Sequence, residues 1–101
     1  MRAFAALADD TRLGIVEALS RREASVNDLV ALFKLSQPAI SQHLKVLRDA
    51  GLVRSRPDAQ RRIYSIDPKG LKQIDTWLKR YRKLWTRRFD RLEAHMDEGE
   101  R

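Results

Sequence analysis

Hydrophobic residues recur along most of the chain at the three- and four-residue spacing of helices that bury one side. This spacing predicts five helices, which begin near residues 4, 9, 25, 36 and 68. Only between residues 52 and 67 does the pattern alternate loosely, which favours two short β-strands. The chain is therefore predicted to be mainly α with a small β-hairpin, in the order α-α-α-α-β-β-α.

The fourth predicted helix has the clearest boundaries. Ser36 can accept hydrogen bonds from the first helical turn, and Pro38 stands where a helix needs no N–H. Gly51 can take the left-handed conformation that ends a helix. One side is apolar, through Ile40, Leu44 and Leu47. The opposite side is polar and comprises Pro38, Ser41, Gln42, Lys45 and Asp49. Such a helix suits the DNA major groove, although taken alone the polar side is equally typical of solvated surface.

Two amphipathic helices precede it. The first is capped by Asp9 and has its apolar positions at Leu13, Ile15, Val16 and Leu19. Arg12 lies in its first turn, where a cation is slightly unfavourable. Arg12 is therefore expected either to contact a phosphate, or to be simply solvated or a partner for Asp9.

The second of these helices begins at a capping-box pattern, with Ser25 as cap and Asp28 three residues later. Its apolar face is formed by Leu29, Val30 and Phe33, and Leu35 is expected to plug the following turn. Two short helices joined by a turn of a few residues are the helix-turn-helix pattern, which we assign to about residues 25–50.

The predicted hairpin spans about residues 52–67, with a turn at residues 57–60. It carries Arg54, Arg56, Arg61 and Arg62 against a single acid, Asp58. An isolated hairpin is only marginally stable, so this one must pack on the helices. A basic hairpin after a reading helix would act as a wing along the DNA backbone or in the minor groove.

The last helix, about residues 68–97, carries an apolar seam through nearly four heptads. At about 40 Å it is longer than one small domain can cover, which predicts a homodimer through the terminal helices. The expected interface residues are Phe4, Leu7, Leu78, Tyr81, Trp85, Phe89 and Leu92. The alternative is a monomer whose helix folds across the domain. The basic middle of this helix is either a solvated face or part of a field that attracts DNA.

Composition narrows the partner and the compartment. The 101 residues form one predicted domain with a net charge of +7, which favours nucleic acid first and an anionic membrane surface second. The chain has no cysteine, no apolar run long enough to span a membrane, and too short an N-terminal apolar region for a signal peptide. We therefore expect a cytoplasmic protein. No nucleophile–base pair, phosphate loop or apolar carboxylate pair is evident, so we expect no enzyme activity and no cofactor.

With these elements in place, the chain resembles the ArsR/SmtB-type winged helix-turn-helix transcriptional repressors over residues 3–97. Residues 7–13 are similar to the family's opening, with Asp10 where proline is usual. Residues 35–47 are similar to its recognition helix, and residues 50–53 with 61–64 to its helix end and wing. The resemblance implies a homodimer that binds an imperfect palindrome in a promoter and represses transcription.

The chain departs from the family at the residues that bind metal in some members. Metal-sensing members carry Cys-Val-Cys-Asp-Leu where this chain has Ser25-Val26-Asn27-Asp28-Leu29, so both thiolates are absent. Other members bind zinc between terminal helices, but His95 is the only histidine there and a closed zinc site needs four ligands. We therefore expect no metal site, and a closer resemblance to the metal-independent members that repress their own operons.

The expected DNA-binding residues fall into two groups. The recognition-helix group is Ser36, Gln37, Pro38, Ser41, Gln42, His43 and Lys45. The wing and backbone group is Arg12, Arg54, Arg56, Arg61 and Arg62. Gln42 can pair with an adenine edge and Lys45 can reach guanine or phosphate, whereas His43 is expected to be half-packed or on a phosphate.

The functional hypothesis is a homodimeric repressor that binds double-stranded DNA in a promoter, with the chain's own promoter as a candidate. A winged-helix protein-interaction module without specific DNA binding is the alternative. An RNA-binding domain is a third reading, but the chain lacks the aromatic stacking surface that single strands need. The sequence identifies no small-molecule effector.

Overall fold

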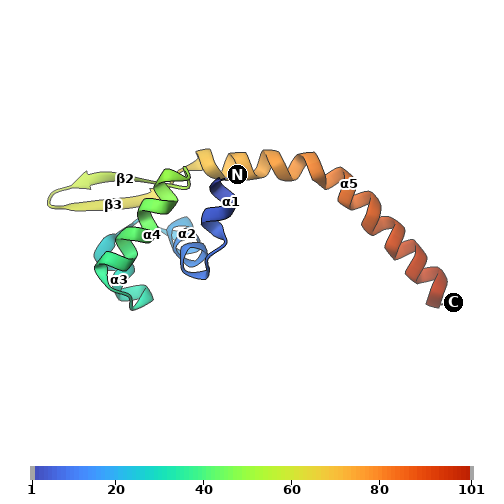
Figure 1. The fold of residues 1–101 in the computed structure, drawn as a ribbon, viewed down its shortest axis with the longest axis horizontal. Coiled ribbons are helices and arrows are strands. Elements are labelled where there is room, and N and C mark those ends of the chain that lie inside the picture. Colours follow the sequence, from blue (N-terminus) through green and yellow to red (C-terminus); the bar gives the residue numbers. More distant parts are fainter. Residues whose placement is uncertain (1, 101) are drawn as a thin grey trace.

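The computed structural model describes the backbone of residues 2–100 and the side chains of residues 2–84, 86–88 and 90–93. Five helices and three strands follow one another along the chain (Figure 1). Their order and bounds are α1 (Arg2–Leu7), α2 (Asp10–Arg21), β1 (Ala24–Ser25), α3 (Val26–Phe33), α4 (Gln37–Asp49), β2 (Val53–Asp58), β3 (Arg61–Ile66) and α5 (Pro68–Glu100). The predicted mainly helical fold with a small hairpin is confirmed.

Side chains at the predicted caps start three of the helices. The Asp9 carboxylate accepts from the Arg12 N–H at 3.0 Å, and the Ser36 hydroxyl accepts from the Ala39 N–H at 3.2 Å. Ser25 and Asp28 form the complete capping box, each side chain accepting from the other's backbone N–H. Gly51, which follows the C-cap residue Ala50 of α4, has a φ of 75°, as predicted. These local hydrogen bonds fix where α2, α3 and α4 begin.

The sheet contains one strand more than the sequence indicated. It has three antiparallel strands in the order β1-β3-β2, because Ala24 and Ser25 pair with Tyr64 and Ile63. The turn between β2 and β3 is also tighter than the predicted residues 57–60: Asp58 still pairs with Arg61, so only two residues make the turn. One of them, Ala59, has a φ of 57°. The extra strand holds the root of the hairpin against α3.

The core lies where α2, α3 and α4 meet the root of the hairpin. The α4 stripe of Ile40, Leu44 and Leu47 is completely buried, as predicted. Two residues that were predicted to be buried are exposed. Leu13 is 41% exposed because it lies to the side of the buried positions of α2, and Leu35 is 36% exposed, so it does not plug the turn between α3 and α4.

Helix α5 begins on the core and then runs away from it (Figure 1). Asp67 accepts from the Lys69 N–H at 3.0 Å at its start, and the Gly70 N–H donates to the Gly51 carbonyl at 2.7 Å. Further along, the Trp77 ring meets the Phe4 ring of α1 edge to face at 5.0 Å between centroids. None of the described helices is apolar for long enough to cross a bilayer.

Candidate nucleic-acid interface

The polar side of α4 is open to solvent over its whole length. All of the predicted recognition residues other than His43 are exposed, namely Ser36, Gln37, Pro38, Ser41, Gln42 and Lys45. The helix that carries them is fixed in place because Ile40, Leu44 and Leu47 anchor its opposite side in the core. The helix therefore presents hydrogen-bonding side chains to a partner without having to reorganise.

His43 lies on the flank of α4 and is half-buried against α2. Its Nδ1 is 3.4 Å from the Arg12 guanidinium, which must be the donor, so Nδ1 carries the lone pair in this arrangement. The Arg12 Nε also donates to the Ala6 carbonyl at 2.7 Å. Arg12 is thus not simply solvated: it ties α1 to α2 and α4.

The Arg12 cluster also perturbs a nearby acid. The pKa of Asp9 is lowered, chiefly because its carboxylate accepts from the Arg12 N–H, and the positive charge of Arg12 adds to this effect. Asp9 and Arg12 thus meet at the corner where α1, α2 and α4 come together.

The wing carries its arginines on exposed ends, three of them in pairs. Arg56 pairs with Glu23, which lies between α2 and β1, Arg61 pairs with Asp58 at 3.2 Å, and Arg62 donates to the Ser55 hydroxyl at 3.2 Å. Exposed ion pairs of this kind contribute little stability and exchange readily. Arg54 is exposed on the same strand as Arg56. A phosphate could replace any of these weak partners.

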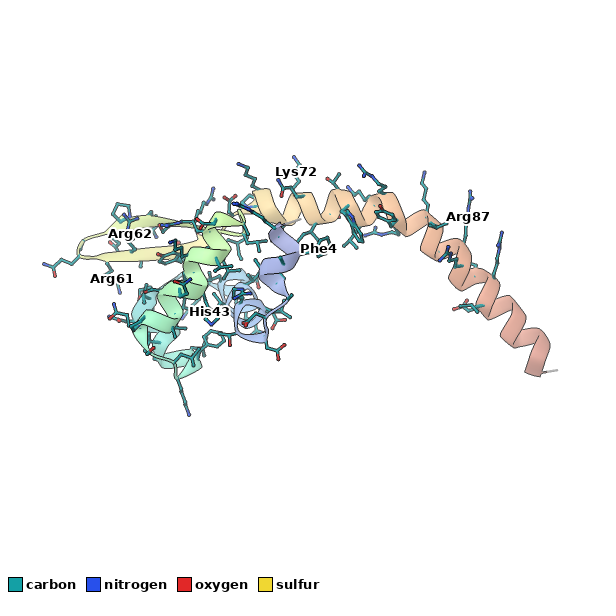
Figure 2. All side chains as sticks on the ribbon, viewed as in Figure 1. Phe4, His43, Arg61, Arg62, Lys72 and Arg87 are labelled. Atoms are coloured by element: carbon teal, nitrogen blue, oxygen red, sulfur yellow. The ribbon has the colours of Figure 1, made fainter. Side chains whose placement is uncertain are left out.

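A groove of about 330 Å³ lies between the wing and the start of α4 and is lined by residues of both. It brings Gln37 and Ser41 of α4 opposite Arg61 and Arg62 of the wing, which Figure 2 labels on the hairpin. Its other lining residues are Ser25, Val26, Asn27, Gln60 and Tyr64. Recognition helix and wing thus share one concave surface, which Arg12, Arg54 and Arg56 do not line.

Sequence reasoning missed two exposed members of this surface, Asn27 and Gln60. The signal for Asn27 was available, because the capping box at Ser25 puts Asn27 in the first turn of α3. Gln60 already lay in the predicted turn at residues 57–60, but its place in the groove depends on how the hairpin packs against the helices.

The predicted dimer residues do not all share one environment. Leu7 packs against the core, whereas Leu78 and Tyr81 are half-buried on α5. Phe4 is 37% exposed and Leu92 is 55% exposed. The side chains of Trp85 and Phe89 lie outside the described residues. Within the single chain, much of the described apolar side of α5 therefore remains uncovered.

The described side chains contain no group of three or more His, Cys, Asp or Glu arranged to hold a metal ion. They do contain a reading helix, a basic wing and a groove that joins the two. This combination defines a winged helix-turn-helix domain of the DNA-binding class.

Comparison with known proteins gives the family. The model of the arsR family of bacterial regulatory proteins matches residues 9–55. The HTH-type transcriptional regulator Rv2034 of Mycobacterium tuberculosis is 49% identical over 86 residues, which are 85% of this chain and 78% of that protein. The transcriptional repressor SmtB homolog of Synechocystis is 43% identical over 63 residues, which are 62% of this chain and 48% of that protein.

A comparison with solved structures points to the same family. An ArsR-like transcriptional regulator from Rhodococcus sp. RHA1 superposes with a TM-score of 0.77 at 30% identity, covering 96% of this chain and 89% of that one. The chain belongs to the ArsR family of bacterial regulatory proteins. It is a DNA-binding transcriptional regulator and not an enzyme.

Proposed function

We propose that the chain is a homodimeric repressor that binds an imperfect palindrome in a promoter, its own promoter being the first to test. The observation that carries the proposal is the shared surface of α4 and the wing, on which Gln37 and Ser41 face Arg61 and Arg62. Polar side chains that read bases and cations that hold phosphates are the two contact types that sequence-specific binding requires.

Each recognition residue has a role that suits its position. Gln42 and Lys45, exposed in the middle of α4, read base edges in the major groove. Ser36 and Gln37, at the positively polarised start of the helix, hold a backbone phosphate. Pro38 contacts a thymine methyl, and Ser41 reaches a base or a phosphate. His43 supports the flank of α4 through Arg12.

The wing positions the domain rather than selecting the sequence. Arg54, Arg56, Arg61 and Arg62 follow the phosphate backbone beside the reading helix. Because the present partners of Arg56 and Arg61 are exposed and weakly held, exchanging them for phosphates costs little.

The second copy docks on α1 and α5. The partly exposed Phe4 and Leu92 and the half-buried Leu78 and Tyr81 support this interface, to which Trp85 and Phe89 would also contribute. A twofold axis between the α5 helices would set two α4 helices apart so that each reads one half of a palindrome. Such a protein works in the cytoplasm, where the promoter is. Ser25 and Asn27, which stand where metal-sensing members carry cysteines, favour the metal-independent members of the family.

Binding to the DNA upstream of the gene tests the proposal. The specific duplex should bind about 10³-fold or more tightly than random duplex at physiological salt. The logarithm of its affinity should fall steeply as salt rises, because phosphate-bound counterions are released. Equal affinity for random DNA would refute a specific repressor and favour a module that binds protein partners.

A further inference from the structure

Six cations form a stripe along α5 that the reading surface does not use. We call them the basic stripe: Lys69, Lys72, Arg80, Lys83, Arg87 and Arg91. At about 100° per residue they fall within roughly a third of the helix circumference. At about 1.5 Å per residue the stripe is roughly 33 Å long.

The stripe lies opposite the side of α5 that packs on the protein. Figure 2 shows Lys72 and Arg87 on one side of the helix and Phe4 of α1 on the other. All six side chains are exposed. Within the described part of α5, one ion pair is formed, between Lys79 and Asp75 at 3.1 Å. Neither residue belongs to the stripe.

Such an arrangement is unfavourable for an isolated helix. Lys83, Arg87 and Arg91 follow one another at four-residue steps, where like charges repel, and one acid, Asp90, falls in the same sector of the helix. A polyanion would relieve this repulsion along the whole stripe. Duplex DNA offers about one negative charge per 1.7 Å of its axis, so a segment lying along the stripe can meet several of its cations at once.

The direction of the stripe separates it from the reading surface. In Figure 1, α5 lies across the end of α4, with α2, α3 and α4 on one side of it. Lys72 and Arg87 point to the other side in the same view. A duplex held by α4 and the wing therefore does not lie along the stripe.

We propose that the basic stripe of α5 is a second surface for duplex DNA, which lets the operator-bound protein hold another DNA segment through its phosphates. The proposal rests on the proposed function for the first segment. Contact through phosphates makes the second segment independent of sequence. A membrane surface fits less well, because an amphipathic helix lies on a bilayer by burying its apolar side, and here Trp77 on that side already packs on Phe4 of α1.

The test uses a two-colour retention assay. The full chain is bound to an immobilised upstream duplex, and a labelled random duplex is then added at salt concentrations from about 50 to about 200 mM. The protein should retain the random duplex at low salt and release it as salt rises, while the upstream duplex stays bound. The double variant Lys83→Gln with Arg87→Gln should lose most of this retention, and the slope of its logarithm against that of salt should fall by about 2.

Two comparisons keep the outcome interpretable. The variant Arg21→Gln with Arg22→Gln removes the same charge from the exposed end of α2 and should retain the random duplex like the wild type. Affinity for the upstream duplex, measured separately, should be the same in all three proteins. A loss of upstream binding in the wild type would instead refute the proposed function.

Three results would overturn the second surface. They are no retention by the wild type, equal retention by the stripe variant, and equal loss in the α2 control. Binding of the wild type to phosphatidylserine vesicles without retention of the random duplex would likewise overturn it, in favour of a membrane partner.

Discussion

At the scale of single residues, the position of a polar side chain relative to the buried stripe of α4 decides what it can do. Gln42 and Lys45 lie well away from that stripe and are exposed, whereas His43 lies at its edge and is half-buried. Spacing alone could place these residues around the helix. It could not show that Arg12 would cross from α2 to meet both His43 and the Ala6 carbonyl, because that contact depends on how three helices pack.

The reading residues give the first prediction. Gln42→Ala and Lys45→Ala should each weaken binding to the specific site by about 1–3 kcal/mol, because each removes hydrogen bonds to a base edge. Affinity for random DNA should change less. Quantitative gel-shift or anisotropy titrations measure both. The matched control is Gln73→Ala with Lys79→Ala on α5, and undiminished specific binding by the α4 double variant would show that α4 does not read the bases.

The capping box predicts acid sensitivity. The pKa of Asp28 is lowered below the ordinary 3.8, first because its carboxylate accepts from the Ser25 N–H and then because of the Ser25 hydroxyl. A lowered pKa in the folded state means that the unfolded chain binds protons more readily. The stabilisation is therefore complete above the ordinary pKa and is lost as pH falls through the lower, folded value.

Urea unfolding at a series of pH values measures this effect. The free energy of unfolding of the wild type should fall as pH drops below about 4, and Asp28→Asn should show a smaller fall. Ser25→Ala should keep part of the pH dependence, because its backbone N–H still donates to Asp28. An Asp28→Asn protein with the full acid dependence of the wild type would contradict the assignment.

At the scale of elements, the helix boundaries were predictable and the sheet only in part. Asp9, Ser25 and Ser36 each bond to a backbone group three residues away, so a short stretch of sequence contains the whole signal. Strand β1 has two residues, and it exists because β3, nearly forty positions later, offers its free edge. No local pattern can predict such pairing, and the same reasoning about distant contacts explains why Leu13 and Leu35 were misassigned to the core.

The junction between α4 and α5 gives an element-scale prediction. A Cβ on Gly70 would lie 2.6 Å from the Gly51 carbonyl oxygen, and the Gly70 N–H donates to that same oxygen. Because the obstacle is backbone, Gly70→Ala should destabilise the fold by about 1–3 kcal/mol. Gly14→Ala is the comparison. Its Cβ would meet the Phe33 ring at 2.9 Å, and a side chain can shift, so the cost should be smaller. Urea denaturation that ranks the two variants the other way round would contradict the rigid junction.

The wing gives a second prediction at the scale of elements. Arg61→Ala with Arg62→Ala should weaken binding to all duplexes by a similar factor and lower the salt slope by about 2, because the lost contacts are to phosphates. The ratio of specific to random affinity should stay the same. An altered sequence preference with an unchanged salt slope would assign these arginines to base edges instead.

At the scale of the whole molecule, a core of α1 to α4 and the sheet carries a helix that extends well beyond it (Figure 1). The molecule measures 65 × 26 × 20 Å, and most of the long dimension comes from α5. The sequence predicted this helix correctly from its sustained apolar seam. How a second copy would cover that seam depends on the surfaces of two chains, which the periodicity of one chain does not specify.

Assembly gives the whole-molecule prediction. Leu78→Glu places a charge on the half-buried side of α5 and should shift the protein from dimer to monomer, with loss of specific DNA binding. Thr76→Glu introduces the same charge on the exposed side and should stay dimeric. Sedimentation velocity with circular dichroism separates dissociation from unfolding. A folded Leu78→Glu protein that remains dimeric would place the interface elsewhere.

Footprinting of the DNA upstream of the gene tests the central claim most directly. A dimer that reads with two α4 helices should protect two inverted half-sites with centres about one helical turn, roughly 34–36 Å, apart. Both half-sites should be lost together in the Leu78→Glu variant. Protection of a single half-site by the wild type, or uniform protection without a preferred sequence, would contradict a dimer that reads two half-sites.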